Sequence, residues 1–249
     1  MTDSTKPTPN VPAEPAKPKL ADGEKNVVVQ RDRETYAIAP HLPCGLVTPE
    51  ILRRIADVAE RYGCQAIKLT SAERIALIGL REPDIDAAWN DLGMTPGSLI
   101  GERVRSVRVC PGTEFCKRGQ QDSLKIGRIL DAKYHGQPMP GKLKISVSGC
   151  PNQCTEPMTK DIGITGAKPG WNLLVGGSGG GNPRLGTFIA RRCTDDEILA
   201  LVDGVVDFYR AQAKPHERLY KTLRRVGLDA LTDALGLPRV EPEATPTTG

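Results

Sequence analysis

Four of the seven cysteines form two spaced pairs whose thiols could share one metal centre. Cys110 pairs with Cys116 and Cys150 with Cys154, and each pair follows a β-type run and stands among Pro, Gly and Asn residues that favour turns. Thiolates prefer soft or borderline metals, and four of them satisfy either a tetrahedral zinc ion or the four irons of a [4Fe–4S] cluster. The pattern therefore predicts a metal centre and leaves its type open.

The spacing within the first pair favours a cluster over zinc. Zinc sites usually place roughly two to four residues between paired cysteines, whereas Cys110 and Cys116 enclose the longer stretch PGTEF. A wider spacing suits an assembly whose ligands spread around it. A purely structural role as small apolar side chains is the weaker interpretation, because both pairs lie beside Pro and Gly. Cys44, Cys64 and Cys193 lack such pairing and are predicted to be core or partly buried thiols without a function.

Length, composition and charge limit the class of protein. A chain of 249 residues with 39% hydrophobic residues can bury one large core or two small ones. The sequence has no run of eighteen apolar residues and no signal-peptide pattern at its N-terminus, so we expect a cytoplasmic protein that does not associate with membranes. In that compartment metal ligation is more common than disulfide bonding. A net charge of +4 is too mild for a dedicated nucleic-acid binder and favours small anions as partners.

The sequence of the N-terminal half predicts a disordered tail followed by a small α+β unit. Residues 1–25 are rich in Pro, Lys, Ala and Glu and cannot offset the entropy of ordering. Thr48 can cap a helix that includes Pro49 in its first turn and ends before Gly63. Two strands and a second helix are then predicted, over residues 65–70, 74–80 and 84–92. This domain is assigned to residues 26–100.

The second half predicts a larger domain over residues 101–236, followed by a C-terminal tail over residues 237–249. A capping box at Thr194 begins one of its helices. Strands are expected at 103–109, 143–147, 161–165, 171–175 and 185–190, and helices at 120–134, from 194 onward and at 216–235. This mixture indicates a sheet with helices on one side and an α+β fold overall.

The segments around the cysteines resemble the sirohaem-dependent sulfite and nitrite reductases. The resemblance is carried by CPGTEFCKRGQQDS and KLKISVSGCPNQC, including the order of the two cysteine spacings. It extends to KDIGI and GWNLLVGGSGGGNPR, and more weakly to HLPCGLVTPEIL and IKLTSAERIALIGL, and so covers roughly residues 36–235. The resemblance implies a ferredoxin-like N-terminal module followed by a mixed α/β sirohaem and iron–sulfur module. The chain is similar to the compact assimilatory-type sulfite reductases, because it has length for only one of the two halves of the larger family members.

The resemblance also implies cofactors and a reaction. In this family the four cysteines hold one [4Fe–4S] cluster, and Cys154 would also bridge the cluster to the sirohaem iron. The implied activity is the six-electron reduction of sulfite to sulfide. The alternatives are reduction of nitrite to ammonia on the same scaffold, or a non-catalytic iron–sulfur protein for electron transfer or redox sensing. No flavin or nicotinamide motif is visible, so we expect an external electron donor such as a ferredoxin-like protein.

Cationic side chains are needed to hold the substrate anion. Lys142 and Lys144 match the family's paired lysines, and alternate residues of a strand share a face. Arg105 resembles the family's arginine before the first cysteine, and the strand period places Arg108 on the opposite face. Ala72 stands where the larger reductases carry an arginine. Arg74, two residues further along and therefore on the same strand face, is predicted to replace that arginine.

Further residues are predicted to contact the carboxylates of sirohaem. They lie in segments that match the family, and they are Arg108, Asn152, Lys160 and Arg184. The glycine run from Gly176 to Gly181 could approach the macrocycle closely. A glycine run alone is most often a flexible loop, so this expectation depends on the resemblance.

Overall fold

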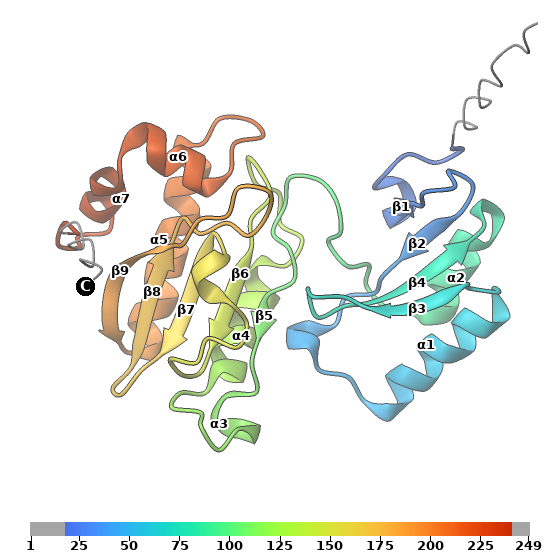
Figure 1. Ribbon diagram of the computed structural model, residues 1–249, viewed down its shortest axis with the longest axis horizontal. Helices are drawn as coiled ribbons and strands as arrows, with labels where there is room; N and C mark the ends of the chain where they lie inside the picture. The colour runs from blue at the N-terminus through green and yellow to red at the C-terminus, as the bar shows by residue number, and fades with distance from the viewer. Residues whose placement is uncertain (1–17, 241–249) are drawn as a thin grey trace, which may run out of the picture.

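The computed structural model describes residues 18–240, which form two units side by side (Figure 1). The N-terminal unit contains a four-stranded sheet and the C-terminal unit a five-stranded sheet. The segment that follows α2 (Ile85–Leu92) joins the two units (Figure 1). The predicted α+β class is confirmed, with the smaller sheet in the N-terminal unit.

The N-terminal sheet is antiparallel, with strand order β1-β2-β4-β3. Its strands are β1 (Val28–Val29), β2 (Tyr36–Ile38), β3 (Ala66–Leu69) and β4 (Ile75–Leu80). Its helices are α1 (Pro49–Arg61) and α2 (Ile85–Leu92), with the short 3₁₀ turns η1 (Glu24–Asn26), η2 (Pro43–Gly45) and η3 (Glu82–Asp84). Thr48 caps α1 by accepting the Ile51 backbone N–H at 3.4 Å, as its sequence position predicts. Both helices bury their apolar faces against the sheet around Leu77.

The structured part of this unit begins earlier than the sequence predicts. Leu20 is buried in the core of the N-terminal unit, and its backbone N–H donates to the Tyr36 hydroxyl at 3.0 Å. Residues 18–25, expected to belong to a disordered tail, are therefore folded against β2. One leucine among many polar residues is too weak a pattern to predict this contact. Residues 1–17 lie outside the described residues.

The C-terminal sheet has the order β5-β6-β7-β8-β9. The first three strands are parallel and the last two are antiparallel additions. Its strands are β5 (Arg108–Val109), β6 (Ile145–Ser148), β7 (Ile162–Gly166), β8 (Trp171–Val175) and β9 (Thr187–Cys193). Its helices are α3 (Gly112–Phe115), α4 (Ser123–Tyr134), α5 (Asp195–Gln212), α6 (Leu219–Val226) and α7 (Leu228–Ala234), with the 3₁₀ turn η4 (Pro157–Thr159). Helices α4 and α5 cover one face of the sheet (Figure 1).

The C-terminal end of the fold agrees with the sequence in part. The capping box at Thr194 is present at the start of α5. The predicted helix over residues 216–235 is divided at Gly227, whose φ of 91° cannot continue a helix. The predicted tail begins too early, because Leu237 and Val240 pack against the core. Residues 241–249 lie outside the described residues.

The segment before the first cysteine differs from its predicted form. A strand was expected over residues 103–109, but only Arg108–Val109 form the strand β5. Before it, Arg103 and Val104 make isolated bridges to Pro138 and Leu143.

Across residues 18–240, no helix is both long enough and apolar enough to cross a membrane.

Candidate active site

The two cysteine loops begin at the carboxyl ends of neighbouring parallel strands. Val109 of β5 pairs with Val147 of β6, so Cys110 and Cys150 follow their strands at the same edge of the sheet. The Cys110 backbone N–H donates to the Val147 carbonyl at 3.1 Å, and the Gly149 N–H donates to the Cys110 sulfur at 3.1 Å. The first cysteine therefore lies directly against the loop that carries the second pair.

Backbone contacts hold the rest of the two loops together. The backbone N–H groups of Gln120 and Gln121 donate to the Gly149 carbonyl at 2.8 and 2.9 Å. A Cβ on Gly149 would lie 2.6 Å from the Gln121 carbonyl oxygen and 3.0 Å from the Cα of Gly112, so only glycine fits this approach. Cys116 ends the short helix α3 and donates its N–H to the Gly112 carbonyl at 2.9 Å.

All four cysteines are free thiols, two of them buried and two exposed. Cys110 and Cys150 are buried at the strand ends, whereas Cys116 and Cys154 are exposed. Within residues 18–240, no three His, Cys, Asp or Glu side chains are arranged to hold a single metal ion. Four thiols on two packed loops fit a multi-iron cluster, whose ligands bind separate corners.

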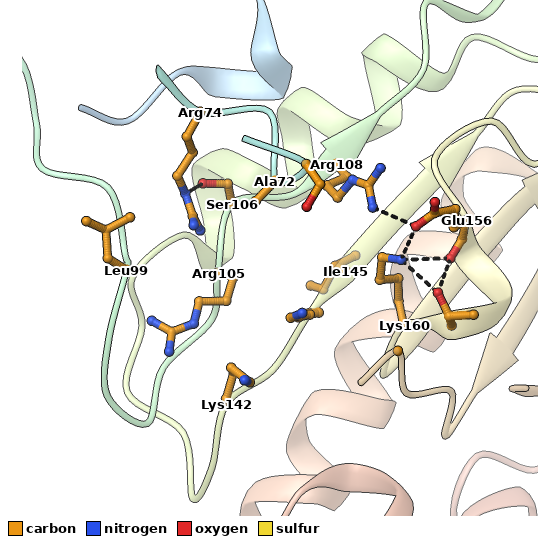
Figure 2. A pocket seen from close by; sticks show the side chains of 14 residues that line it. Ala72, Arg74, Leu99, Arg105, Ser106, Arg108, Lys142, Ile145, Glu156 and Lys160 are labelled. Atoms are coloured by element: carbon orange, nitrogen blue, oxygen red, sulfur yellow. Dashed lines mark hydrogen bonds and ion pairs between the residues drawn. The ribbon is translucent and has the colours of Figure 1, made fainter. Parts of the chain in front are cut away.

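A cavity of about 410 Å³ lies between the two units, beside the second cysteine loop (Figure 2). The hairpin between β3 and β4 lines it on one side, and the segments before β5 and β6 line it on another. The chain that follows Cys154 completes the wall. Among its 14 lining residues are six cations and one acid, and the cations are Arg74, Arg105, Arg108, Lys142, Lys144 and Lys160.

The structure brings six of the predicted site residues together in this cavity and leaves two of them, Arg184 and Asn152, outside it. All six cations of the cavity were predicted from the sequence. Arg184 lines a separate hollow, where its guanidinium carbon lies 5.5 Å from the centre of the Tyr220 ring. Asn152 lies exposed in the second cysteine loop and does not line the cavity.

The prediction that Arg105 and Arg108 lie on opposite faces of a strand is wrong. The strand period placed them on opposite faces, but both line the cavity, because the chain before β5 is not a regular strand. Lys142 and Lys144 also precede their strand, which begins at Ile145, and still line the same cavity.

Arg74 also lines the cavity, but from a turn and not from a strand as predicted. Ala72 and Arg74 were expected on one strand face. They lie instead in the tight turn between β3 and β4, where the Thr70 N–H donates to the Arg74 carbonyl at 2.9 Å. Both residues line the cavity.

Two arginines are fixed by one carbonyl group at the cavity wall. Arg74 is only 8% exposed, and its Nη2 donates to the Ser98 carbonyl at 3.2 Å while its Nε donates to the Ser106 hydroxyl at 2.9 Å. Arg105 donates through Nη1 to the same Ser98 carbonyl at 2.9 Å. Burial, together with Arg74 and other nearby arginines, lowers the pKa of Arg105 to about 10.

The two lysines are in an environment that disfavours their positive charge. Burial, followed by repulsion from Arg218 and Arg105, lowers the pKa of Lys142. Burial, followed by repulsion from Lys142 and other cations, lowers the pKa of Lys144. A bound anion would relieve this repulsion, so the cavity is suited to a small, compact anion.

The sequence interpretation missed two acidic residues that organise these cations. Glu156 accepts from Arg108 Nη1 at 3.1 Å and from Lys160 Nζ at 3.2 Å, and these bonds lower the pKa of Glu156 (Figure 2). The buried Asp161 accepts a hydrogen bond from the Lys144 backbone N–H at 2.8 Å. Both of its carboxylate oxygens also accept from Arg218 Nη2, each at 2.8 Å. Asp161 lies in the KDIGI segment that carries the resemblance, which is the one signal that could have identified it.

Comparisons with known proteins agree with this geometry. The family model described as "Nitrite and sulphite reductase 4Fe-4S domain" matches residues 100–241, and "Nitrite/Sulfite reductase ferredoxin-like half domain" matches residues 28–94. The chain is 38% identical over 216 residues to an assimilatory-type sulfite reductase of Nitratidesulfovibrio vulgaris, covering 87% of this chain and 99% of the relative.

Other relatives are longer. A nitrite reductase [NAD(P)H] of Bacillus subtilis is 37% identical over 215 residues, which cover 86% of this chain but 27% of that protein. Among solved structures, dissimilatory sulfite reductase I aligns with a TM-score of 0.75 at 18% identity, covering 86% of this chain and 73% of the other. At that identity the structural match supports the shared fold alone.

Proposed function

This chain belongs to the nitrite and sulphite reductase family, and on that premise we propose that it reduces sulfite to sulfide in the cavity between its two units. The observation that carries the proposal is the cavity itself, where six cationic side chains line one space next to the chain that follows Cys154. A small oxyanion is the ligand that such a site stabilises best.

The residues present fit the family's two cofactors. The packed loops offer four free thiols for a [4Fe–4S] cluster, which Cys110, Cys116, Cys150 and Cys154 would hold, and Cys154 would also serve the sirohaem. When bound, the cluster and the sirohaem would pass electrons from the donor to the substrate. The carboxylates of sirohaem would find cations in Arg108 and Lys160, with Asn152 and Arg184 as outer partners. Glu156 forms ion pairs with both Arg108 and Lys160, at 3.1 and 3.2 Å, and its single negative charge leaves this group of three side chains with a net positive charge.

The remaining cations would bind and protonate the substrate. Lys142, Lys144, Arg105 and Arg74 neutralise the anion and hold it in one orientation. Because the pKa of each lysine is lowered, its ammonium group gives up a proton more easily than an ordinary lysine does. The oxygens of the substrate leave as water, and the two lysines are the proton donors we assign to that step.

Nitrite is the second candidate substrate. The Bacillus subtilis relative, 37% identical, is a nitrite reductase, and nitrite is also a small anion that the same cations could hold. A non-catalytic electron-transfer or sensing protein is a weaker alternative, because it would have no use for Lys142 and Lys144 in a cavity.

The electrons would come from an external donor such as a ferredoxin-like protein. A reducing cytoplasm is the compartment that would keep the four thiols available.

Turnover of the purified holoenzyme tests this proposal. With reduced methyl viologen as the electron donor, we expect sulfide to form from sulfite with a kcat/KM at least about tenfold above that for nitrite. A preference for nitrite would replace the substrate and retain the reaction class. Protein that contains both cofactors but reduces neither anion would contradict the proposed activity.

A further inference from the structure

A partly buried cluster of two histidines and one aspartate lies near the cavity and contacts the segment that holds two of its arginines. Asp131 and His135 come from α4 and the turn that ends it, whereas His41 comes from the N-terminal unit after β2. The His41 Nε2 lies 2.7 Å from the Asp131 Oδ2, and the rings of His41 and His135 stack with centroids 3.4 Å apart and an interplanar angle of 9°. The cluster therefore joins the two units at one point.

The cluster is connected to the cavity through Ser98. The backbone N–H of Ser98 donates to the His135 Nε2 at 3.3 Å. The carbonyl of the same residue accepts from both Arg74 and Arg105, as described above. Ser98 is buried, and its neighbour Gly97 is packed so closely that a Cβ there would lie 2.8 Å from the Ala39 carbonyl oxygen. Displacement of Ser98 would therefore move both arginines together.

The hydrogen bond to Ser98 requires a neutral imidazole with an unprotonated Nε2. Burial, and next the charge of His41, lower the pKa of His135 to about 4, so the ring is neutral near pH 7. The ionised form of Asp131 can only accept, and it accepts the Val107 N–H at 3.2 Å through its second oxygen. Asp131 thus holds His41 and also the segment between Arg105 and Arg108.

We propose that His135 is a positioning residue of the anion site, which fixes the Ser98 peptide and thereby the separation of Arg74 and Arg105, while Asp131 and His41 hold its ring. The inference rests on the proposed function for the identity of the anion. Like charges repel, so the two guanidinium groups stay together only while their common acceptor is held in place. Loss of the His135 acceptor leaves the Ser98 N–H buried without a partner and lets the arginines separate.

Two substitutions of His135 distinguish the role of its acceptor nitrogen from the role of its aromatic ring. His135→Phe keeps an aromatic ring against His41 but removes the acceptor, whereas His135→Gln removes the ring and keeps an acceptor oxygen at a similar distance. With His135→Phe holoenzyme we expect the KM for sulfite to rise about tenfold with kcat changed less than about twofold, because anion binding is lost before chemistry is. With His135→Gln we expect KM to return to within about threefold of the wild-type value.

Tyr134→Phe is the matched control. Tyr134 directly precedes His135 in the sequence, and this substitution removes its hydroxyl contact with Asp203. The hydrogen bond between Ser98 and His135 is left in place. We expect it to lower the thermal midpoint without changing KM. A KM that is unchanged in His135→Phe, or raised equally in His135→Phe, His135→Gln and Tyr134→Phe, would overturn the positioning role.

Binding of sulfate to the holoenzyme, measured by calorimetry, makes this test independent of turnover. We expect His135→Phe to bind sulfate about tenfold more weakly than wild type. Equal sulfate affinities in His135→Phe and the wild type, including no measurable binding to either protein, would overturn the positioning role. Wild-type protein that binds sulfate but reduces neither sulfite nor nitrite would overturn the proposed function alone. If His135→Phe does not accumulate, Asp131→Asn carries the test, because its amide oxygen keeps the Val107 contact and its N–H groups face His41. An affinity equal to that of the wild type would then be the contrary result.

Discussion

Replacing Lys142 and Lys144 together by Met is expected to lower kcat/KM for sulfite by about a thousandfold or more, with the iron and sirohaem contents unchanged. Both ammonium groups line the cavity and neither is needed to hold the cysteine loops. Methionine keeps most of the length and apolar stem of lysine and removes the charge and the donated protons. Steady-state turnover with reduced methyl viologen gives the two kinetic constants.

The control for this variant is Lys221→Met, which removes an exposed lysine of α6 and should leave turnover unchanged. The pH profile adds a second check. Because the pKa of each cavity lysine is lowered, its charged form is lost as the pH rises through a value below the usual 10.5. Wild-type activity should therefore decline on the alkaline side below that value. An equal kcat/KM in the double variant and the wild type would remove both lysines from the mechanism.

The second large effect is expected at the cysteines. Cys110→Ser should lose most of its cluster iron and inorganic sulfide, because a serine hydroxyl replaces a thiolate ligand at the buried end of the site. Cys193→Ser is the matched control, since the two residues are 8% and 6% exposed and both are free thiols at strand ends. Burial raises the pKa of the Cys193 thiol. Iron analysis of both variants, purified without oxygen, measures the difference.

Cys154→Ser tests the bridging role separately. If one sulfur serves both cofactors, this variant should change the visible absorption of the sirohaem as well as the cluster content. A Cys154→Ser protein with an unchanged sirohaem spectrum would limit Cys154 to the cluster. Equal iron loss in Cys110→Ser and Cys193→Ser would mean that the loss follows from general destabilisation.

The sequence predicts those parts of the fold that depend on local patterns. The cap at Thr48, the capping box at Thr194 and the strand at residues 171–175 are all present, because each is specified by neighbouring residues. The two cysteine loops and the six cations also lie within short recognisable segments. Strands β1 and β2 were not predicted, since runs of two and three residues are too short to show a period.

Features that depend on distant contacts could not be predicted. Residues 103–107 carry a strand-like pattern, but their backbone pairs in isolated bridges with residues 137–143, so the period-two argument for Arg105 and Arg108 fails. His41 and Asp131 are ninety positions apart and meet only when the two units pack. The single acid of the cavity, Glu156, resembles any surface glutamate in the sequence.

The measurement that tests the account most directly is the metal and pigment content of wild-type protein prepared without oxygen. The account predicts about five irons and four inorganic sulfides per chain, four irons from the cluster and one from the sirohaem, together with a Soret band and a red-region band. Protein that is folded but contains neither iron nor sulfide, or that binds zinc in their place, would contradict it.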